Sequence, residues 1–264
     1  TNYILTRMTE EGVSYHEALA EAQSLGYAER DPTADVEGFD AGAKAAIVAS
    51  IAFGARVVAG DVYHEGISGI TAADIAFARR LGYVVKLLAI VERFDGEIGV
   101  RVHPAMVPSQ HPLASVRESY NAVFVEGDAV GNLMFYGRGA GGTPTASAVL
   151  GDLIDAAGNL RKGAGATLGS LAKARIRSID EVESEYYLQM DVFDRPGVLA
   201  QVASVFATND VSIRAMEQDG LGDEARLIFI THTARERDVQ ATLRDLRELE
   251  AVDRVGTVLR VIGA

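Results

Sequence analysis

The 264-residue sequence contains no cysteine, few aromatic residues and no long apolar run. Without cysteine, the chain has no disulfide, no thiolate nucleophile and no cysteine-ligated metal. Its longest apolar runs, such as residues 83–91, include a lysine and are far too short to span a bilayer. We therefore expect no membrane partner, and we expect a cytoplasmic protein.

Positive charge is also scarce, because 25 Lys and Arg residues face 37 Asp and Glu residues, giving a net charge of −12. Such a surface repels phosphate backbones and anionic lipid, so we expect no nucleic-acid partner. A local site can still accept a nucleotide cofactor. The five histidines show no clustered metal-ligand spacing. We expect no metal site, and we place the histidines, including His103 and His111, in loops or on the surface.

The first residues carry neither an initiator methionine nor a signal peptide, because Thr1 opens directly into the amphipathic run 2–8. This run resembles the middle of a secondary-structure element and not its start. We therefore expect the chain to be a piece of a longer protein.

The first half of the sequence alternates helix and strand signals. This order indicates an α/β or α+β domain in which helices cover one face of a mixed sheet. Residues 14–17 and 71–74 form capping-box patterns. Asp40 is expected to cap an alanine-rich helix that ends near residue 55, and Thr143 is expected to cap a later helix. The expected strands are residues 84–92, 98–102, 121–126 and 132–136.

The second half divides into a linker and a smaller unit. Residues 161–184 are rich in Gly, Ala, Ser and basic residues with little periodicity, so we expect a linker with one edge strand between domains 1–160 and 185–264. The later unit reads as strand, helix, strand, strand, helix, strand, which is the βαββαβ ferredoxin-like order. Its expected elements are 186–193, 198–208, 212–218, 225–232, 235–248 and 255–261.

Two carboxylates and a lysine stand out as chemical groups. Asp40 and Lys44 are four residues apart, so a helix places them on one face, and Glu29 lies on a loop able to fold back over the same helix start. Two carboxylates can bind a substrate ammonium group, and a desolvated lysine can move a proton at an alcohol or aldehyde oxygen. The spacing alone favours an ordinary surface ion pair, in which Asp40 is an N-cap paired with Lys44. The run Ala43–Ala49 is so apolar that we expect the helix to be buried almost all round, which favours a functional lysine.

A glycine-rich turn, residues 137–142, fits the G-x-G-x-x-G pattern between a strand and a helix. A Rossmann fold would need a second strand ending in an acidic residue about 20 residues later. The sequence offers a glycine-rich linker there instead. The pattern therefore also fits a plain tight turn.

Four ordered blocks resemble the homoserine dehydrogenase family. They are Thr1-Asn2-Tyr3-Ile4-Leu5, Gly26-Tyr27-Ala28-Glu29-x-Asp31-Pro32 with Gly38-x-Asp40-x-x-x-Lys44, His111-Pro112-Leu113-Ala114 with residues 121–128, and residues 137–149. The resemblance implies that Glu29 and Asp40 bind substrate, that Tyr27 lines the pocket and that Lys44 transfers a proton. It also implies that Gly139 and Gly141 contact the nicotinamide end of the cofactor.

The implied reaction is the reversible, NAD- or NADP-dependent oxidation of L-homoserine to L-aspartate 4-semialdehyde, in threonine, methionine and isoleucine biosynthesis. The resemblance covers the substrate-binding catalytic domain and not the dinucleotide-binding domain. We therefore expect the cofactor to be bound mainly by an absent N-terminal domain and the isolated chain to be inactive.

The C-terminal unit resembles an ACT domain. Asp194-Arg195-Pro196-Gly197-Val198-Leu199 lies between its first strand and first helix, where free backbone N–H groups can hold a carboxylate. The resemblance implies amino-acid binding at Asp194, Pro196, Gly197, Val198 and Leu199, threonine as an allosteric effector, and a homodimer or homotetramer. A dimerisation domain whose turn binds nothing is the alternative. For the whole chain, the alternative to an enzyme is a non-catalytic amino-acid sensor or oligomerisation protein.

Overall fold

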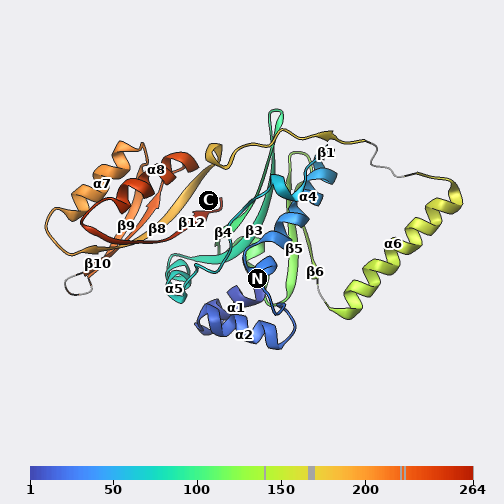
Figure 1. Ribbon diagram of the computed structural model, residues 1–264, viewed down its shortest axis with the longest axis horizontal. Helices are drawn as coiled ribbons and strands as arrows, with labels where there is room; N and C mark the ends of the chain where they lie inside the picture. Colours follow the sequence, from blue (N-terminus) through green and yellow to red (C-terminus); the bar gives the residue numbers. More distant parts are fainter. Residues whose placement is uncertain (140, 166–169, 221, 223, 264) are drawn as a thin grey trace.

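The computed structural model describes residues 1–139, 141–165, 170–220, 222 and 224–263 as a mixed α/β molecule built on one central sheet (Figure 1). The strand order is β2-β4-β12-β8-β10-β9, with β3 beside β4 and β11 beside β8. These strands are β2 (Tyr63–His64), β3 (Tyr83–Phe94), β4 (Glu97–Pro108), β8 (Glu183–Phe193), β9 (Ile213–Gly220), β10 (Glu224–Thr231), β11 (Ala234–Arg235) and β12 (Val252–Val261). Parallel and antiparallel pairs occur together, which confirms the expected mixed sheet.

The helices of the first half pack on the long β3–β4 hairpin. They are α1 (Asn2–Glu11), α2 (Tyr15–Ser24), α3 (Thr33–Val36), α4 (Phe39–Phe53) and α5 (Ala72–Arg80). The capping boxes expected at residues 14–17 and 71–74 are both present, at the starts of α2 and α5. Asp40 does not cap α4, because Gly38 holds that position in the left-handed region and Asp40 falls in the first turn.

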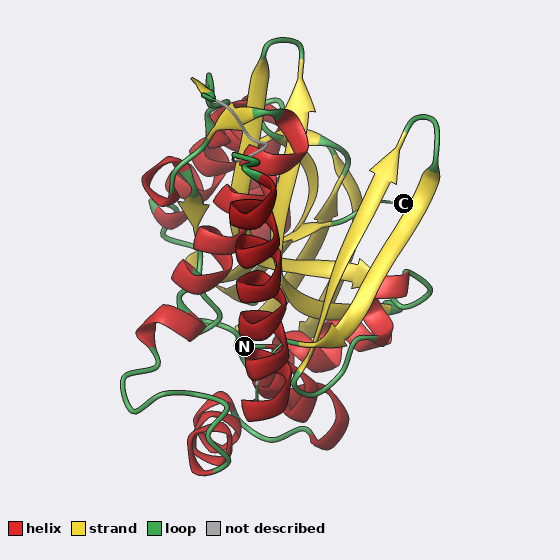
Figure 2. Ribbon diagram, turned by 90° about the vertical axis from the view of Figure 1, so that its right-hand side faces the viewer, coloured by secondary structure: helices red, strands yellow, loops and turns green. Residues whose placement is uncertain are grey.

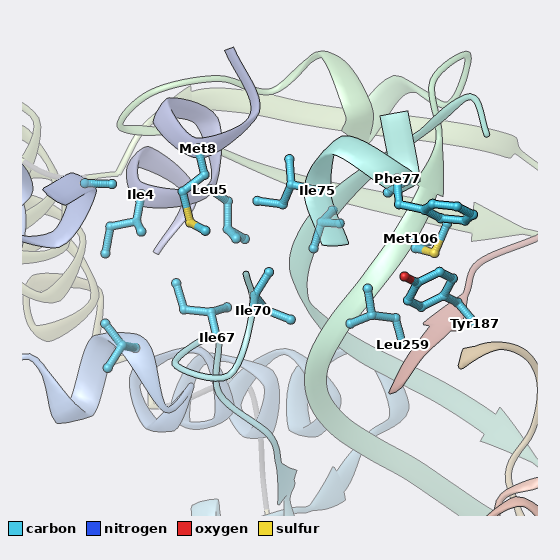
Figure 3. Close-up of a cluster of buried hydrophobic side chains, with 14 of the residues drawn as sticks. Ile4, Leu5, Met8, Ile67, Ile70, Ile75, Phe77, Met106, Tyr187 and Leu259 are labelled. Atoms are coloured by element: carbon cyan, nitrogen blue, oxygen red, sulfur yellow. The ribbon is translucent and has the colours of Figure 1, made fainter. Parts of the chain in front are cut away.

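The largest apolar cluster joins α1, α2 and α5 to the sheet. Ile4, Leu5 and Met8 project from one face of α1, because residues three and four apart share a helix face. In Figure 3, Phe77 of α5 lies against Met106 of β4 and Tyr187 of β8, with Leu259 of β12 nearby. The residues of this cluster come from both halves of the chain, so their burial ties the first half to the last.

The C-terminal unit has the expected βαββαβ order, with α7 (Val198–Thr208) and α8 (Glu236–Arg247). Alternating residues of β8 face opposite sides of the sheet. Leu188 and Met190 pack beneath α7 and α8, whereas Tyr187 joins the cluster of the first half. Helices therefore cover both faces of this part of the sheet.

A parallel pairing between β12 and β4 joins the two halves into one sheet. Arg260 lies opposite Ala105, and Val261 lies opposite Met106. Such continuity did not follow from the sequence, which predicted two separate units joined by residues 161–184. The helix before this region ends at Lys162 and β8 begins at Glu183, whereas residues 166–169 lie outside the described residues. The expected edge strand is β7 (Ala172–Lys173), which pairs in parallel with β1 (Ala55–Arg56).

The junction contains a buried charge network. The guanidinium of Arg260, only 4% exposed, donates from Nη2 to Glu65 Oε1 at 2.8 Å and from Nε to Glu236 Oε2 at 2.8 Å. Tyr186 Oη donates to Glu236 Oε2 at 2.9 Å, and Tyr63 Oη donates to Glu65 Oε1 at 2.6 Å. A buried arginine is tolerated when its donors meet carboxylates in this way.

His103 lies beside this network on β4 and is 1% exposed, so its expected place in a loop or on the surface is wrong. The reason is that β4 extends to Pro108 and carries the His-Pro pair inside the sheet. Its ring Nδ1 is 3.0 Å from the carbonyl oxygen of Pro104. Burial, together with the positive charges of Arg260 and Arg101, lowers the pKa of His103 to about 3.

Two other elements project from this body. The antiparallel pair β5 (Tyr120–Gly127) and β6 (Gly131–Arg138) forms a separate two-stranded sheet. It leads to α6 (Gly142–Lys162), which stands away from the rest in Figure 1, faces the viewer in Figure 2 and buries none of its residues. Gly141, not Thr143, is its N-cap. Within the described residues, no helix is both long and apolar enough to cross a membrane.

We predict that Glu236→Ala lowers the free energy of unfolding by about 3–5 kcal/mol, because it leaves the Arg260 charge buried with one carboxylate fewer. Glu183→Ala is the matched control: Glu183 pairs with Arg235, and both side chains are about half exposed. The control is expected to cost at most about 1 kcal/mol. Urea denaturation measures both values, and equal losses in the two variants would contradict the role of the network.

We also predict that His103 makes the fold sensitive to acid. Its pKa is lower in the folded state, so between about pH 6.5 and pH 3 the unfolded chain binds the extra proton and stability falls as pH falls, by at most about 1.4 kcal/mol per pH unit. His103→Leu should flatten this dependence in denaturation curves, whereas the same change at the exposed His232 should not. An unchanged pH slope in His103→Leu would refute the prediction.

Candidate active site

Helix α4 presents Asp40 and Lys44 on its exposed side, one turn apart. Lys44 Nζ donates to Asp40 Oδ2 at 2.5 Å. The two side chains are 67% and 52% exposed, respectively. Gly38, with φ 81°, starts the helix in the left-handed region that favours glycine. The pair is therefore an open cation and carboxylate near the N-terminus of a helix.

The expectation that α4 is buried almost all round is wrong. Its alanines Ala45, Ala46 and Ala49 pack on the sheet, but Ile47 and Ile51 are each 60% exposed. The sequence of this run resembles that of a buried helix because alanine is apolar. Its small side chains, however, mainly let the helix approach the sheet closely. The apolar surroundings of Lys44 in the sequence thus do not translate into burial in this chain.

The buried lysine of the first half is Lys86, on β3. Its ammonium donates to the carbonyl oxygen of Val116 and, at 2.9 Å, to Asn2 Oδ1. Burial, together with the positive charge of Arg117, lowers the pKa of Lys86 to about 8. This lysine holds α1 and the segment before β5 to the sheet, a role that the sequence pattern did not indicate.

Glu29 and Tyr27 lie on the loop that follows α2. Gln23 Nε2 donates to the carbonyl oxygen of Glu29 at 3.0 Å, which fixes the backbone there, and both candidate side chains are exposed. The ring of Tyr27 packs on Tyr3 of α1, with centroids 5.1 Å apart. Among the described residues, no hydrogen bond or ion pair joins Glu29 to Lys44.

The start of α1 brings this loop and α4 toward each other. Burial lowers the pKa of the Thr1 amino group, and the charges of Asp35, Asp40 and Lys44 act on it as well. Since Tyr3 follows within the same turn of α1, the Tyr27 loop and the Asp40–Lys44 pair both border the first turn of α1. Asp40 and Tyr27 thus approach one region from two elements, and no interaction of the described residues places the Glu29 carboxylate there.

Strand β2 supports α4 from below. The ring of His64 lies 5.1 Å from that of Phe39, and a Cβ on Gly42 would lie 2.0 Å from His64 Nε2. The next residue, Glu65, is the carboxylate that binds Arg260. Adjacent residues of the chain therefore connect the packing of α4 to the charge network at the junction.

The glycine-rich turn has two different environments. Gly141 has φ 115° and Gly142 has no atom near a hypothetical Cβ, so the backbone is open there. A Cβ on Gly139 would lie 2.2 Å from Asn121 Nδ2, so that glycine is needed for internal packing. Ala140 lies outside the described residues. No hydrogen bond or ion pair of the described residues joins this turn to Lys44.

The C-terminal turn places Gly197 as N-cap of α7, with φ 90° and no side-chain cap. Asp194 Oδ1 accepts a long hydrogen bond, 3.5 Å, from Gln218 Nε2 of β9. Val198 is buried, whereas Leu199 is 37% exposed. Pro196 lies in the same turn, so the expected effector residues are all presented at one end of α7.

Sequence reasoning missed the residues that join the halves, chiefly Glu65, Glu236 and Arg260. Charged residues at the ends of strands and helices look ordinary in a sequence, and only pairing of β12 with β4 brings them together. An arginine flanked by apolar residues in β12 was the one available signal. In the described residues, no group of three His, Asp or Glu side chains has the arrangement of a metal site.

Comparisons with known families match both halves. Residues 1–154 match the sequence model of homoserine dehydrogenase, and residues 186–251 match that of the ACT domain. The chain is 52% identical to the homoserine dehydrogenase of Corynebacterium glutamicum over 99% of its length, and 49% identical to that of Mycobacterium tuberculosis over 100%. It spans 60% and 62% of those two relatives.

Solved structures give the same result. The fold resembles a homoserine dehydrogenase from Thiobacillus denitrificans with a TM-score of 0.92 and 39% identity, covering 98% of this chain and 61% of that one. The Staphylococcus aureus homoserine dehydrogenase at pH 7.5 gives a TM-score of 0.74 and 31% identity, covering 100% and 62%. The likeness therefore extends over the catalytic and C-terminal parts together.

We predict that Gly42→Ala lowers the free energy of unfolding by about 1–3 kcal/mol, because the added methyl group displaces His64 beneath α4. The control is Gly151→Ala in α6, where a Cβ meets no atom within 4 Å. This control should be neutral or stabilising by up to about 1 kcal/mol. Chemical denaturation measures both, and a Gly42→Ala variant as stable as the parent would contradict the packing described.

Proposed function

Because this chain belongs to the homoserine dehydrogenase family, we propose that it carries the substrate-binding and proton-transferring residues of an enzyme that interconverts L-homoserine and L-aspartate 4-semialdehyde. The observation that carries the proposal is the Asp40–Lys44 pair, 2.5 Å apart and exposed on α4 within the matched region. The activity would serve threonine, methionine and isoleucine biosynthesis, in the cytoplasm.

Glu29 and Asp40 are proposed to bind the ammonium group of homoserine. A carboxylate accepts hydrogen bonds from an ammonium most strongly when both are ionised. Support comes from the two elements that border the first turn of α1 and from the hydrogen bond between Gln23 and the backbone of Glu29. Tyr27, held against Tyr3, would form one wall of the site.

Lys44 is proposed to move the proton at the substrate oxygen. In the oxidative direction its neutral amine accepts the hydroxyl proton, and in the reductive direction its ammonium returns a proton to the aldehyde oxygen. Asp40 orients the amine through the hydrogen bond to Nζ. Lysine suits this role because its ammonium is a compact charge on a flexible stem.

NAD or NADP, when bound, supplies the acceptor for the hydride that leaves the same substrate carbon. Gly141 and the open backbone beside it fit an edge contact with such a group, whereas Gly139 is occupied in packing on Asn121. We therefore propose that the cofactor is held mainly by a domain outside these 264 residues and that the chain alone is inactive.

The C-terminal part is proposed to be a regulatory ACT domain, 185–264, joined through 161–184 to a catalytic domain, 1–160. Threonine is the proposed effector, with its carboxylate at the uncapped start of α7. The proposed contacts are Asp194, Pro196, Gly197, Val198 and Leu199.

A homodimer or homotetramer is the proposed assembly. The β5–β6 hairpin exposes large apolar side chains on both strands, and an isolated two-stranded sheet is marginally stable in water. The exposed members are Val123, Val125, Leu133, Phe135 and Tyr136. A monomeric mass in light scattering would contradict this assembly.

We predict that Lys44→Ala, introduced into the longer protein that contains this chain, lowers kcat by about 100-fold to 10,000-fold, the usual range for loss of a general acid or base. The fold should be unaffected because Lys44 is exposed. Steady-state assays of homoserine oxidation give kcat, and circular dichroism checks the fold.

Lys173→Ala is the matched control for that experiment, since Lys173 is an exposed lysine on β7. It should leave kcat unchanged. Near-normal turnover in Lys44→Ala would remove the lysine from the mechanism.

We predict that L-threonine binds the 264-residue chain with a saturable heat in isothermal titration calorimetry. Asp194→Ala should weaken binding, whereas Asp253→Ala, at an exposed carboxylate of β12, should not. No heat at millimolar threonine would leave the C-terminal domain with an assembly role only.

A further inference from the structure

We propose that a cavity at the junction of β4, β2 and the segment 176–182 is a binding site for a small oxyanion. The cavity measures about 270 Å³, and its lining residues differ from every residue of the proposed active and effector sites. Two arginines, Arg101 and Arg177, line it from separate elements. A volume this small suits a phosphate or a short carboxylate better than a dinucleotide.

Arg101 supplies a buried donor. Its side chain is 9% exposed, and its Nη1 donates to Glu92 at 2.5 Å. Its Nε is buried and has no hydrogen-bond partner among the described residues. A buried N–H without an acceptor costs about 1–3 kcal/mol, more beside a charge, so an oxyanion that enters far enough to accept from this atom would recover that free energy.

Arg177 supplies a second donor. Its fixed position favours binding of an oxyanion in the plane of the guanidinium group. The guanidinium stacks on the ring of Phe94, 4.2 Å from the centroid, and Nη2 donates to the carbonyl oxygen of Glu181 at 3.1 Å. Its Nε is also buried without a partner in the part of the chain that the structure describes. Stacking occupies the face of the group and leaves the N–H edge available for an oxyanion.

The backbone holds the two arginines in place. The N–H of Arg177 donates to the carbonyl oxygen of Ile98 at 3.0 Å. This hydrogen bond holds the segment 176–182 against β4, three residues before Arg101. A Cβ on Gly99 would lie 3.0 Å from Phe94 and 3.6 Å from Arg101 Nη1, so glycine leaves room where the groups converge.

Three carboxylates of this region have hydrogen-bond or ion-pair partners of their own. Asp61, in the lining, accepts from the N–H of Val58 at 3.0 Å, and Glu92 is paired with Arg101. The carboxylate of Glu181 lies 3.6 Å from Arg237. Among the described residues, Arg177 has no carboxylate partner, so its positive charge is available to an anion.

The test is a titration of the ¹⁵N-labelled 264-residue chain with inorganic phosphate and, separately, with acetate, at constant ionic strength set by chloride. Arginine Nε–Hε resonances report on the two unpartnered groups directly. We expect saturable shifts of the Arg101 and Arg177 signals. Saturation with phosphate only, or with acetate only, identifies which oxyanion the site takes.

Substitutions complete the test. Arg177→Gln should weaken binding by about tenfold or more, the loss expected for one charge-assisted hydrogen bond. Arg101→Gln should weaken binding to the same degree. If the Arg101→Gln variant does not fold, Arg177→Gln alone tests the proposal. Arg175→Gln is the control, since Arg175 is 80% exposed and pairs with Glu97. Unmoved Nε–Hε signals, or equal weakening by Arg175→Gln, would overturn the proposal.

Discussion

The buried guanidinium of Arg260 is the interaction on which the rest of the arrangement depends. It lies in β12, the last strand of the chain, yet its partners are Glu236 on α8 and Glu65 beside β2. A charge buried to this degree is tolerated only with both carboxylates in place, so the pairing of β12 with β4 is specified as well as stabilised. The two halves of the chain therefore share one sheet.

That constraint reaches the candidate active site through a short chain of contacts. Glu65 follows His64, whose ring fills the space above Gly42 and packs on Phe39. The same turn of α4 presents Asp40. A shift of β12 relative to β4 would thus act on the helix that carries the proposed catalytic groups. This contact path is a physical route between β12 and α4.

Much of the fold was predictable from local signals. The capping boxes, the strand alternation and the βαββαβ order all follow from short-range patterns, and α7 was predicted to the residue. Burial was harder to predict, because it depends on which surfaces meet. Lys44, in an apolar run, is exposed, whereas Lys86 and His103 are buried by segments that lie far apart in the sequence. Candidate site residues could be named from their motif, but their distances from one another could not.

A crystal structure of the longer protein with L-homoserine and cofactor bound tests the proposed site most directly. We predict that the substrate hydroxyl lies within about 3 Å of Lys44 Nζ and that the carboxylates of Glu29 and Asp40 bind the substrate ammonium. A homoserine molecule whose hydroxyl points away from Lys44, or whose ammonium is held by other residues, would contradict it.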